Sequence, residues 1–155
     1  MKKIATYLIS ILLVEALGFT VGMLTRTGTE IYAGMINKPP LSPPGILFPI
    51  AWTILYALMG VGVARIILSG QSYERRIAVI LFAAQLVLNL AWCFIFFGAQ
   101  KFMLAFVELI IMLALVMMMI IFFRKTDTLA AMLQIPYIMW LCFAAYLNLG
   151  VVVLN

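Results

Sequence analysis

Histidine is absent from this sequence of 155 residues. Its absence excludes zinc or haem ligation by imidazole, a Ser-His-Asp triad and proton relay through a histidine side chain. Charge is also scarce, because Lys, Arg, Asp and Glu together make up only 10% of the chain. A soluble domain carries about 25% charged residues, so these few charges could not cover a surface that faces water. The composition therefore predicts that the solvent of this chain is lipid.

Cysteine is nearly absent as well. The two cysteines, Cys93 and Cys142, both lie within apolar stretches. We interpret them as small apolar core residues rather than as a disulfide or a metal site. The sequence predicts no metal site and no required cofactor.

Apolar residues, in contrast, make up 67% of the chain and gather in five long stretches. A helix needs about 20 mostly apolar residues to cross the hydrocarbon layer, so each stretch is long enough to span a membrane. Lys2 and Lys3 could open a signal peptide, but Glu15 interrupts its apolar region, and we expect this segment to remain as a helix. We predict an all-α integral membrane protein, a five-transmembrane-helix bundle in one domain over residues 1–155. The expected helices cover residues 4–24, 46–68, 77–97, 102–123 and 129–154.

The basic residues flank the apolar stretches and are not gathered on one face, which argues against binding to nucleic acid. If the stretches cross the membrane in turn, seven basic residues fall on the side of the N-terminus and three on the other. The seven are Lys2, Lys3, Arg65, Arg75, Arg76, Arg124 and Lys125, and the three are Arg26, Lys38 and Lys101. Because cytoplasmic loops carry the positive excess, we expect a cytoplasmic N-terminus and an external C-terminus, in a bacterial cell membrane.

The connection over residues 25–45 is long and rich in proline. Its prolines are Pro39, Pro40, Pro43 and Pro44. Proline fixes φ and biases the preceding residue, here Lys38, toward extended conformations. We therefore expect a stiff, folded segment, and a long ordered loop in a compact protein is often a lid over a binding site. A plain external loop is the alternative.

Polar and aromatic residues recur at helical spacing in three of the predicted spans. Residues three or four apart share one face of a helix. The residues of these stripes are Trp52 and Tyr56 in the second span, Gln85, Asn89 and Trp92 in the third, and Tyr137, Trp140, Ala144 and Asn148 in the fifth. Turned inward, they would line a cavity for a flat apolar ligand with a few polar edges. Alternatively they only join helices, since Asn and Gln hydrogen-bond across membrane helices and tryptophan anchors at the membrane interface.

Two acids, a proline and a glycine pair also fall inside the predicted spans. Acids at membrane depth usually face the bundle interior, so we expect Glu15 and Glu108 to hydrogen-bond a neighbouring helix, with a proton-coupled role as the alternative. Pro136 is expected to bend the fifth helix. The pattern Gly18-x-x-x-Gly22 permits close helix packing, within one chain or in a homodimer.

Several motifs resemble those of the TspO/MBR family. In the long connection and second span they are Tyr32-Ala-Gly34, Lys38-Pro39, Pro43-Pro44 and Trp52-x-x-Leu55-Tyr56-x-x-Met59-Gly60. In the third and fifth spans they are Gln85-Leu-Val-Leu-Asn89-Leu-Ala-Trp92, Pro136-Tyr137-x-x-Trp140-x-x-Phe143-Ala144 and Leu147-Asn148. Each motif alone is weak, but the set follows the order of the family along the whole chain.

The resemblance implies a five-helix membrane protein that binds porphyrins and other hydrophobic ligands in a pocket beneath the first loop. It implies that the stripe residues line or shape this pocket and that the loop with Tyr32 and Lys38 covers it. In some bacterial relatives, tryptophans that match Trp52 and Trp140 are implicated in light-dependent porphyrin breakdown. Dimers are common in the family.

This sequence departs from the family pattern in the loop and after the fifth span. Ile31 precedes Tyr32 where the family has a Trp-Tyr pair, and Leu41 stands where a tryptophan is frequent. Closure of the loop over a ligand by aromatic stacking is therefore not implied. No basic residue follows Asn148, so sterol binding through an aromatic-then-basic pattern is not implied either.

The leading hypothesis is a membrane protein that binds tetrapyrroles and other hydrophobic molecules, with a role in transport or stress sensing. Without histidine, a porphyrin would be held by stacking on tryptophan and by hydrogen bonds from Asn and Gln to its edge. An alternative is a light-dependent porphyrin-degrading enzyme, in which the pigment supplies the chemistry and Trp52 or Trp140 is the redox partner. A small-solute transporter is a second alternative, which the patchy distribution of polar residues disfavours.

Overall fold

All five apolar stretches form helices in a computed structural model, which describes residues 2–155. The elements are α1 (Lys2–Leu24), α2 (Arg26–Met35), α3 (Leu47–Leu68), α4 (Tyr73–Cys93), the π-helical turn η1 (Phe94–Gly98), α5 (Phe102–Thr126), α6 (Thr128–Met132) and α7 (Ile135–Leu154). Five spans are long and apolar enough to cross a membrane, with η1 completing the third and α6 beginning the fifth. Within residues 2–155 no strand is formed. The predicted all-α bundle of five membrane-spanning helices is confirmed.

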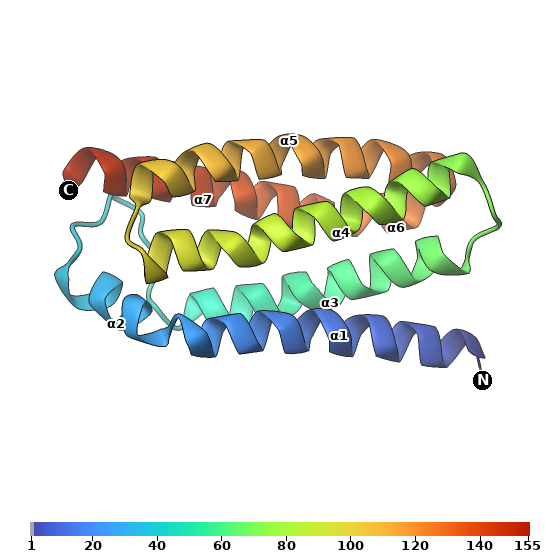
Figure 1. Cartoon of the computed structure of the whole chain (residues 1–155), viewed down its shortest axis with the longest axis horizontal. Helices are drawn as coiled ribbons and strands as arrows, with labels where there is room; N and C mark the ends of the chain where they lie inside the picture. The colour runs from blue at the N-terminus through green and yellow to red at the C-terminus, as the bar shows by residue number, and fades with distance from the viewer. Residues whose placement is uncertain (1) are drawn as a thin grey trace.

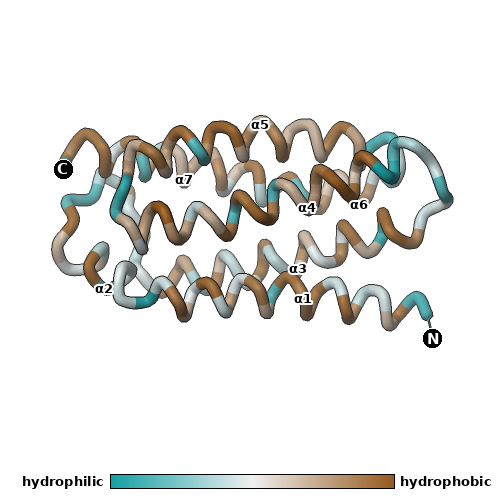
Figure 2. Tube along the Cα trace, in the orientation of Figure 1, coloured by the Kyte–Doolittle hydropathy of each residue, from teal (hydrophilic) through white to brown (hydrophobic). Residues whose placement is uncertain are grey.

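The long helices run side by side, with α2 and the C-terminus at one end of the bundle and the N-terminus at the other (Figure 1). Helix α1 packs on α3, α4 on α5, and α5 on α7. Hydrophobic residues follow the length of the helices, whereas hydrophilic ones gather toward the ends (Figure 2). Large apolar side chains also cover the outside of the bundle; Ile9 and Phe19 on α1, for example, are 65% and 72% exposed. Such an outer surface suits lipid rather than water.

Helices α1 and α3 approach closely because glycines stand at their crossing. A Cβ atom at Gly18 would overlap the ring of Tyr56, and one at Gly60 would lie 2.6 Å from Cα of Ile11. Gly22, four residues after Gly18, has no atom within 4 Å of such a Cβ position. The first glycine of the GxxxG pattern is therefore used for packing inside the chain.

A salt bridge joins the end of α3 to the junction of α5 and α6. Nε and Nη2 of Arg65 donate to the two carboxylate oxygens of Asp127 at 3.0 and 2.8 Å. Asp127 also accepts from the backbone N–H of Ala130 at 2.8 Å and so caps α6. These hydrogen bonds, that of Arg65 first, hold the pKa of Asp127 below its usual range. The bridge therefore stabilises the fold above that range and is lost as acid protonates Asp127.

Two helical features differ from the sequence-based expectation. The long connection contains a helix, α2, where only a folded loop was expected. The fifth span is interrupted rather than bent, because α6 ends at Met132 and α7 begins at Ile135. Pro136 thus occupies the first turn of α7, where its missing N–H costs no helical hydrogen bond.

The two cysteines occupy different environments. Cys93 is partly buried, and its thiol donates to the backbone carbonyl of Asn89 at 3.8 Å. Cys142 is exposed on the outer face of α7. The expectation that both belong to the core was wrong for Cys142, because apolar surroundings in sequence do not distinguish the core from a lipid-facing surface.

Candidate functional site

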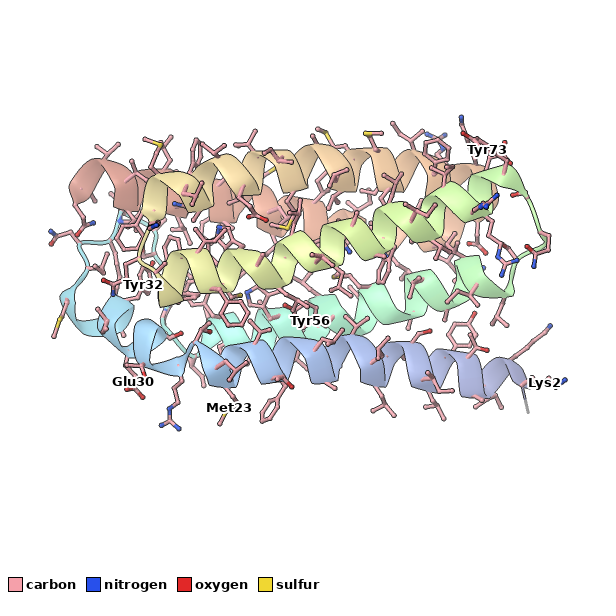
Figure 3. The ribbon with its side chains drawn as sticks, in the orientation of Figure 1. Lys2, Met23, Glu30, Tyr32, Tyr56 and Tyr73 are labelled. Atoms are coloured by element: carbon pink, nitrogen blue, oxygen red, sulfur yellow. The ribbon has the colours of Figure 1, made fainter. Side chains whose placement is uncertain are left out.

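Four buried polar side chains join α3, α4 and α7 in the middle of the bundle. The hydroxyl of Tyr56, labelled in Figure 3, donates to Oδ1 of Asn89 at 2.8 Å, and Nδ2 of Asn89 donates to the hydroxyl of Tyr137 at 3.1 Å. The Tyr137 hydroxyl in turn donates to Oε1 of Gln85 at 2.8 Å. All four residues are buried, and a hydrogen bond between membrane helices is worth about 0.6 kcal/mol on average. The predicted stripes therefore meet inside the bundle, where their polar members link three helices.

An aromatic cluster lies against this polar network. We define it as Trp52, Tyr56, Tyr137 and Trp140. The ring of Trp52 lies 5.2 Å from that of Tyr56, 6.3 Å from that of Trp140 and 6.4 Å from that of Tyr137, measured between centroids. The tyrosines are buried and the tryptophans partly buried. Rings at these distances stabilise one another by about 0.5–1.5 kcal/mol per pair, and their faces are the surfaces on which a flat apolar ligand would stack.

Trp92 and Asn148 form a separate link near the α2 end of the bundle. The indole N–H of Trp92 donates to Oδ1 of Asn148 at 3.2 Å, and Nδ2 of Asn148 donates to the carbonyl of Phe102 at 2.9 Å. The Trp92 ring also stacks on Phe96, with centroids 4.6 Å apart. This link joins α4, α5 and α7, the role that the helix-joining alternative gives to both residues.

Three apolar residues beside the aromatic cluster were not assigned to the site from sequence. The ring of Phe48 lies 6.0 Å from that of Trp140, and the ring of Phe143 lies 5.9 Å from it. Ala51, on α3, lines a hollow next to Trp140. Helical spacing could have found the two phenylalanines, since Phe143 follows Trp140 by three residues and Phe48 precedes Trp52 by four. Ala144, which was assigned, is partly buried and packs against the core one turn after Trp140.

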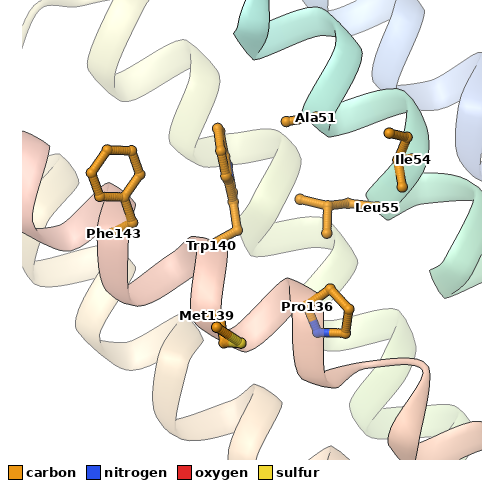
Figure 4. Close-up of a pocket in the computed structure, with 7 residues that line it drawn as sticks. All are labelled: Ala51, Ile54, Leu55, Pro136, Met139, Trp140 and Phe143. Carbon is orange, nitrogen blue, oxygen red and sulfur yellow. The ribbon is translucent and has the colours of Figure 1, made fainter. Parts of the chain in front are cut away.

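A hollow beside the aromatic cluster opens toward the outside of the bundle. The side chains that were expected to line an inner cavity contact one another instead, through the hydrogen bonds and ring contacts above. This hollow, of about 480 Å³, lies beside Trp140, between α3 and α7 (Figure 4). It is lined by Ala51, Ile54, Leu55, Pro136, Met139, Trp140 and Phe143. A ligand that reached the inner rings would therefore have to separate side chains that are now in contact.

The loop after α2 contacts α2 through Lys38, and α2 packs on η1. Lys38 donates to the carbonyl of Ala33 at 2.7 Å, and its ammonium group lies 5.3 Å from the centre of the Tyr32 ring. Tyr32 packs on the rings of Phe96 and Phe97 at 5.5 and 5.7 Å. Burial raises the pKa of Tyr32. Tyr32, one of the residues assigned to a lid, thus anchors α2 on η1.

The proline segment is attached to the end of α7. Asn37 and Asn155 exchange two hydrogen bonds of 3.0 Å, backbone N–H to Oδ1 and Nδ2 to backbone carbonyl. Pro39 is buried, and a Cβ at Gly150 would lie 2.5 Å from it, so only glycine permits this approach. The Tyr146 hydroxyl adds a hydrogen bond of 2.7 Å to the carbonyl of Pro40. Pro43 and Pro44 lead from this contact into the first turn of α3, where the N–H of Leu47 donates to the carbonyl of Pro44 at 2.9 Å.

The interior also contains polar atoms without partners. Nε2 of Gln85 and both carboxylate oxygens of Glu108 are buried and make no hydrogen bond to any residue that the structure describes. The hydrogen bond expected from Glu108 to a neighbouring helix is therefore not formed. Glu15, the other acid at membrane depth, is only partly buried on α1. Buried unpartnered groups cost free energy, and here the free N–H₂ group of Gln85 is a donor next to the aromatic cluster.

Comparison with known proteins places these residues in a family. Residues 10–154 match the model of the TspO/MBR family. The chain is 35% identical to the tryptophan-rich protein TspO of Chlorobaculum tepidum over 99% of its own length and 98% of that protein. It is 37% identical to the translocator protein of Ovis aries over 87% of its length and 86% of that protein. Identity to the tryptophan-rich sensory protein of Cereibacter sphaeroides is 36%, over 77% of this chain and 74% of the relative.

Proposed function

Because the chain belongs to the TspO/MBR family, we propose that it binds porphyrins and other flat hydrophobic molecules at the aromatic cluster. The observation that carries the proposal is the convergence of Trp52, Tyr56, Tyr137 and Trp140 from α3 and α7. Their ring faces offer stacking surfaces, and the free N–H₂ group of Gln85 offers a hydrogen bond to a polar edge. Relatives named for sensing and for translocation support a role for this binding in stress sensing or transport.

The proposed binding mode needs no axial ligand on the porphyrin. The chain has no histidine, and within residues 2–155 no group of three or more Cys, Asp and Glu could hold a metal ion. Stacking on aromatic faces is indifferent to whether the macrocycle contains a metal. We therefore expect metal-free protoporphyrin to bind as well as its iron complex.

Titration of the purified protein with protoporphyrin tests the proposal. The absorbance of the porphyrin itself is the readout, so that replacing a tryptophan does not remove the signal. We expect saturable binding that Trp140→Phe weakens at least fivefold and Trp52→Phe/Trp140→Phe weakens further, because stacking area is lost. Phe19→Leu, on the exposed face of α1, is the matched control and should bind like the parent. Equal binding by the double variant and the control would refute the site.

The pairing of the two tryptophans favours light-dependent porphyrin breakdown as a second candidate function. The rings of Trp52 and Trp140 lie 6.3 Å apart at 80°, so a bound pigment that stacked on one ring would lie close to both. Excitation of the pigment would drive the oxidation, with dissolved oxygen as oxidant and an indole as redox partner. We expect illumination in air to produce a new absorbance band that Trp52→Phe and Trp140→Phe both reduce and that removal of oxygen abolishes. Bleaching at the same rate in all variants would leave binding alone.

A further inference from the structure

The hollow beside Trp140 is a lateral groove that faces the hydrocarbon of the bilayer. All seven of its lining residues are apolar, and they come from the two membrane spans that contain α3 and α7 (Figure 4). Leu55 forms the floor, since it is only 4% exposed, whereas Ile54 and Met139 at the rims are 56% and 67% exposed. It is a shallow, open groove with a volume of about 480 Å³. The groove is therefore accessible to a molecule dissolved in the membrane without passage through water.

The groove lies between α3 and α7, which pack only loosely against each other. We call this boundary between the two helices the seam. Helix α3 packs mainly on α1, and also on α4 and α6, whereas α7 packs mainly on α5. The interruption at Leu133 and Gln134 separates the two parts of the fifth span, so that α6 contacts α3 and α7 then follows α5. Pro136, in the first turn of α7, lines the groove directly. The seam thus begins where the fifth span is interrupted.

Trp140 is the one member of the aromatic cluster that lines the groove. Its ring lines the groove and also contacts Trp52 at 6.3 Å. Its contacts with Phe48 and Phe143, like that with Trp52, are edge-on ring contacts. Among residues 2–155 its indole N–H has no hydrogen-bond acceptor, whereas that of Trp92 is bonded to Asn148. Rotation of Trp140 therefore breaks no hydrogen bond.

The route past the proline segment, in contrast, is closed by hydrogen bonds. The proline segment is bound to α7 by the reciprocal hydrogen bonds of Asn37 and Asn155 and by that of Tyr146 to Pro40. Pro39 is packed against Gly150 beneath these bonds. Opening the loop would break several hydrogen bonds and expose a buried proline, whereas displacing Trp140 would break three ring contacts and no hydrogen bond.

We infer that hydrophobic ligands enter from the bilayer through the groove between α3 and α7, with Trp140 as the movable wall, and that the loop stays closed. The inference rests on the proposed function, because it concerns the route to the same aromatic cluster. The chemical class follows from the groove: an apolar, flat molecule partitions into hydrocarbon and meets only carbon and sulfur side chains on its way to Trp140.

Association rates in bilayer nanodiscs test the route, with protoporphyrin as the probe and stopped-flow absorbance as the readout. Ala51→Phe fills the groove and should slow association at least tenfold. Ile50→Phe adds a similar ring on an exposed position of α3 that does not line the groove and should leave the rate unchanged. Met139→Ala removes an exposed rim residue with little cost to folding and should raise the rate by two- to fivefold.

A disulfide tests the alternative entrance in the same assay. Asn37→Cys/Asn155→Cys, in a Cys93→Ala/Cys142→Ala background, would staple the loop to α7, and thiol titration would report its closure. We expect equal association rates before and after reduction of the staple. Slower association in the stapled form, or rates that neither groove variant changes, would overturn the lateral route. Absence of saturable binding in the parent at equilibrium would instead refute the proposed function.

Discussion

Tyr137 belongs both to the polar network and to the aromatic cluster. Its hydroxyl accepts from Asn89 and donates to Gln85, and its ring belongs to the aromatic cluster. The residue is fully buried. Removal of the hydroxyl alone would leave one buried donor and one buried acceptor without partners, which costs more than the hydrogen bonds themselves contribute.

Tyr137→Phe tests the polar network at the scale of a single atom. We expect it to lower the free energy of unfolding in detergent by about 1–3 kcal/mol, measured by denaturant titration without ligand. Tyr73→Phe makes the same chemical change at a tyrosine that is 69% exposed and should change stability by less than about 0.5 kcal/mol. Equal effects of the two substitutions would show that the network does not hold α4 and α7 together.

The sequence predicted which helix faces meet inside the bundle, but not how the side chains on those faces contact one another. The spacing of Gln85 and Asn89 on one helix, and of Tyr137 on another, placed them on faces that do meet. Spacing does not report side-chain rotamers or contacts between helices, so it could not show that these residues contact one another. For the same reason it could not show that Glu108 has no partner.

At the scale of elements, the crossing of α1 and α3 depends on which glycine of the GxxxG pattern faces the bundle. Alanine at Gly18 would push the Tyr56 ring away, whereas alanine at Gly22 meets no atom of the described chain. We expect Gly18→Ala to destabilise the protein by about 1–3 kcal/mol through overpacking, and Gly22→Ala to be neutral or slightly stabilising. Thermal unfolding in detergent measures both, and comparable losses in the two variants would indicate that Gly22 packs against a second copy.

The sequence predicted the helices that hydrophobicity alone determines. It did not predict the features that depend on tertiary contacts. The five spans follow from long apolar runs, which have one stable arrangement in lipid. Helix α2 has no such run, and it is held by the packing of Tyr32 on Phe96 and Phe97. The break in the fifth span was misplaced because Pro136 fits the first turn of a helix, so the chain turns before it at Leu133 and Gln134 instead of bending around it.

For the whole molecule, the distribution of charge implies one orientation in the membrane. The end of the bundle that holds the N-terminus carries Lys2, Lys3, Arg75 and Arg76, and the Arg65–Asp127 bridge lies at the same end. The other end carries Lys38, Lys101 and Arg26, the last paired with Glu30 on α2. Since basic residues are retained on the cytoplasmic side, we propose that α2 and the proline segment are external.

Cysteine labelling tests this orientation. In a Cys93→Ala/Cys142→Ala background, Met35→Cys lies at the exposed end of α2 and Tyr73→Cys at the exposed start of α4, at the opposite end of the bundle. An impermeant maleimide on intact cells should label Met35→Cys at once and Tyr73→Cys only after permeabilisation. The reverse pattern would invert the topology, and with it the side on which the loop covers the bundle.

The clasp between Asn37 and Asn155 also bears on how the protein is handled in the laboratory. Any peptide fused after Asn155 starts next to the residue that anchors the proline segment, so an affinity tag there would crowd that anchor. A tag placed ahead of Lys2 lies at the far end of the bundle (Figure 1).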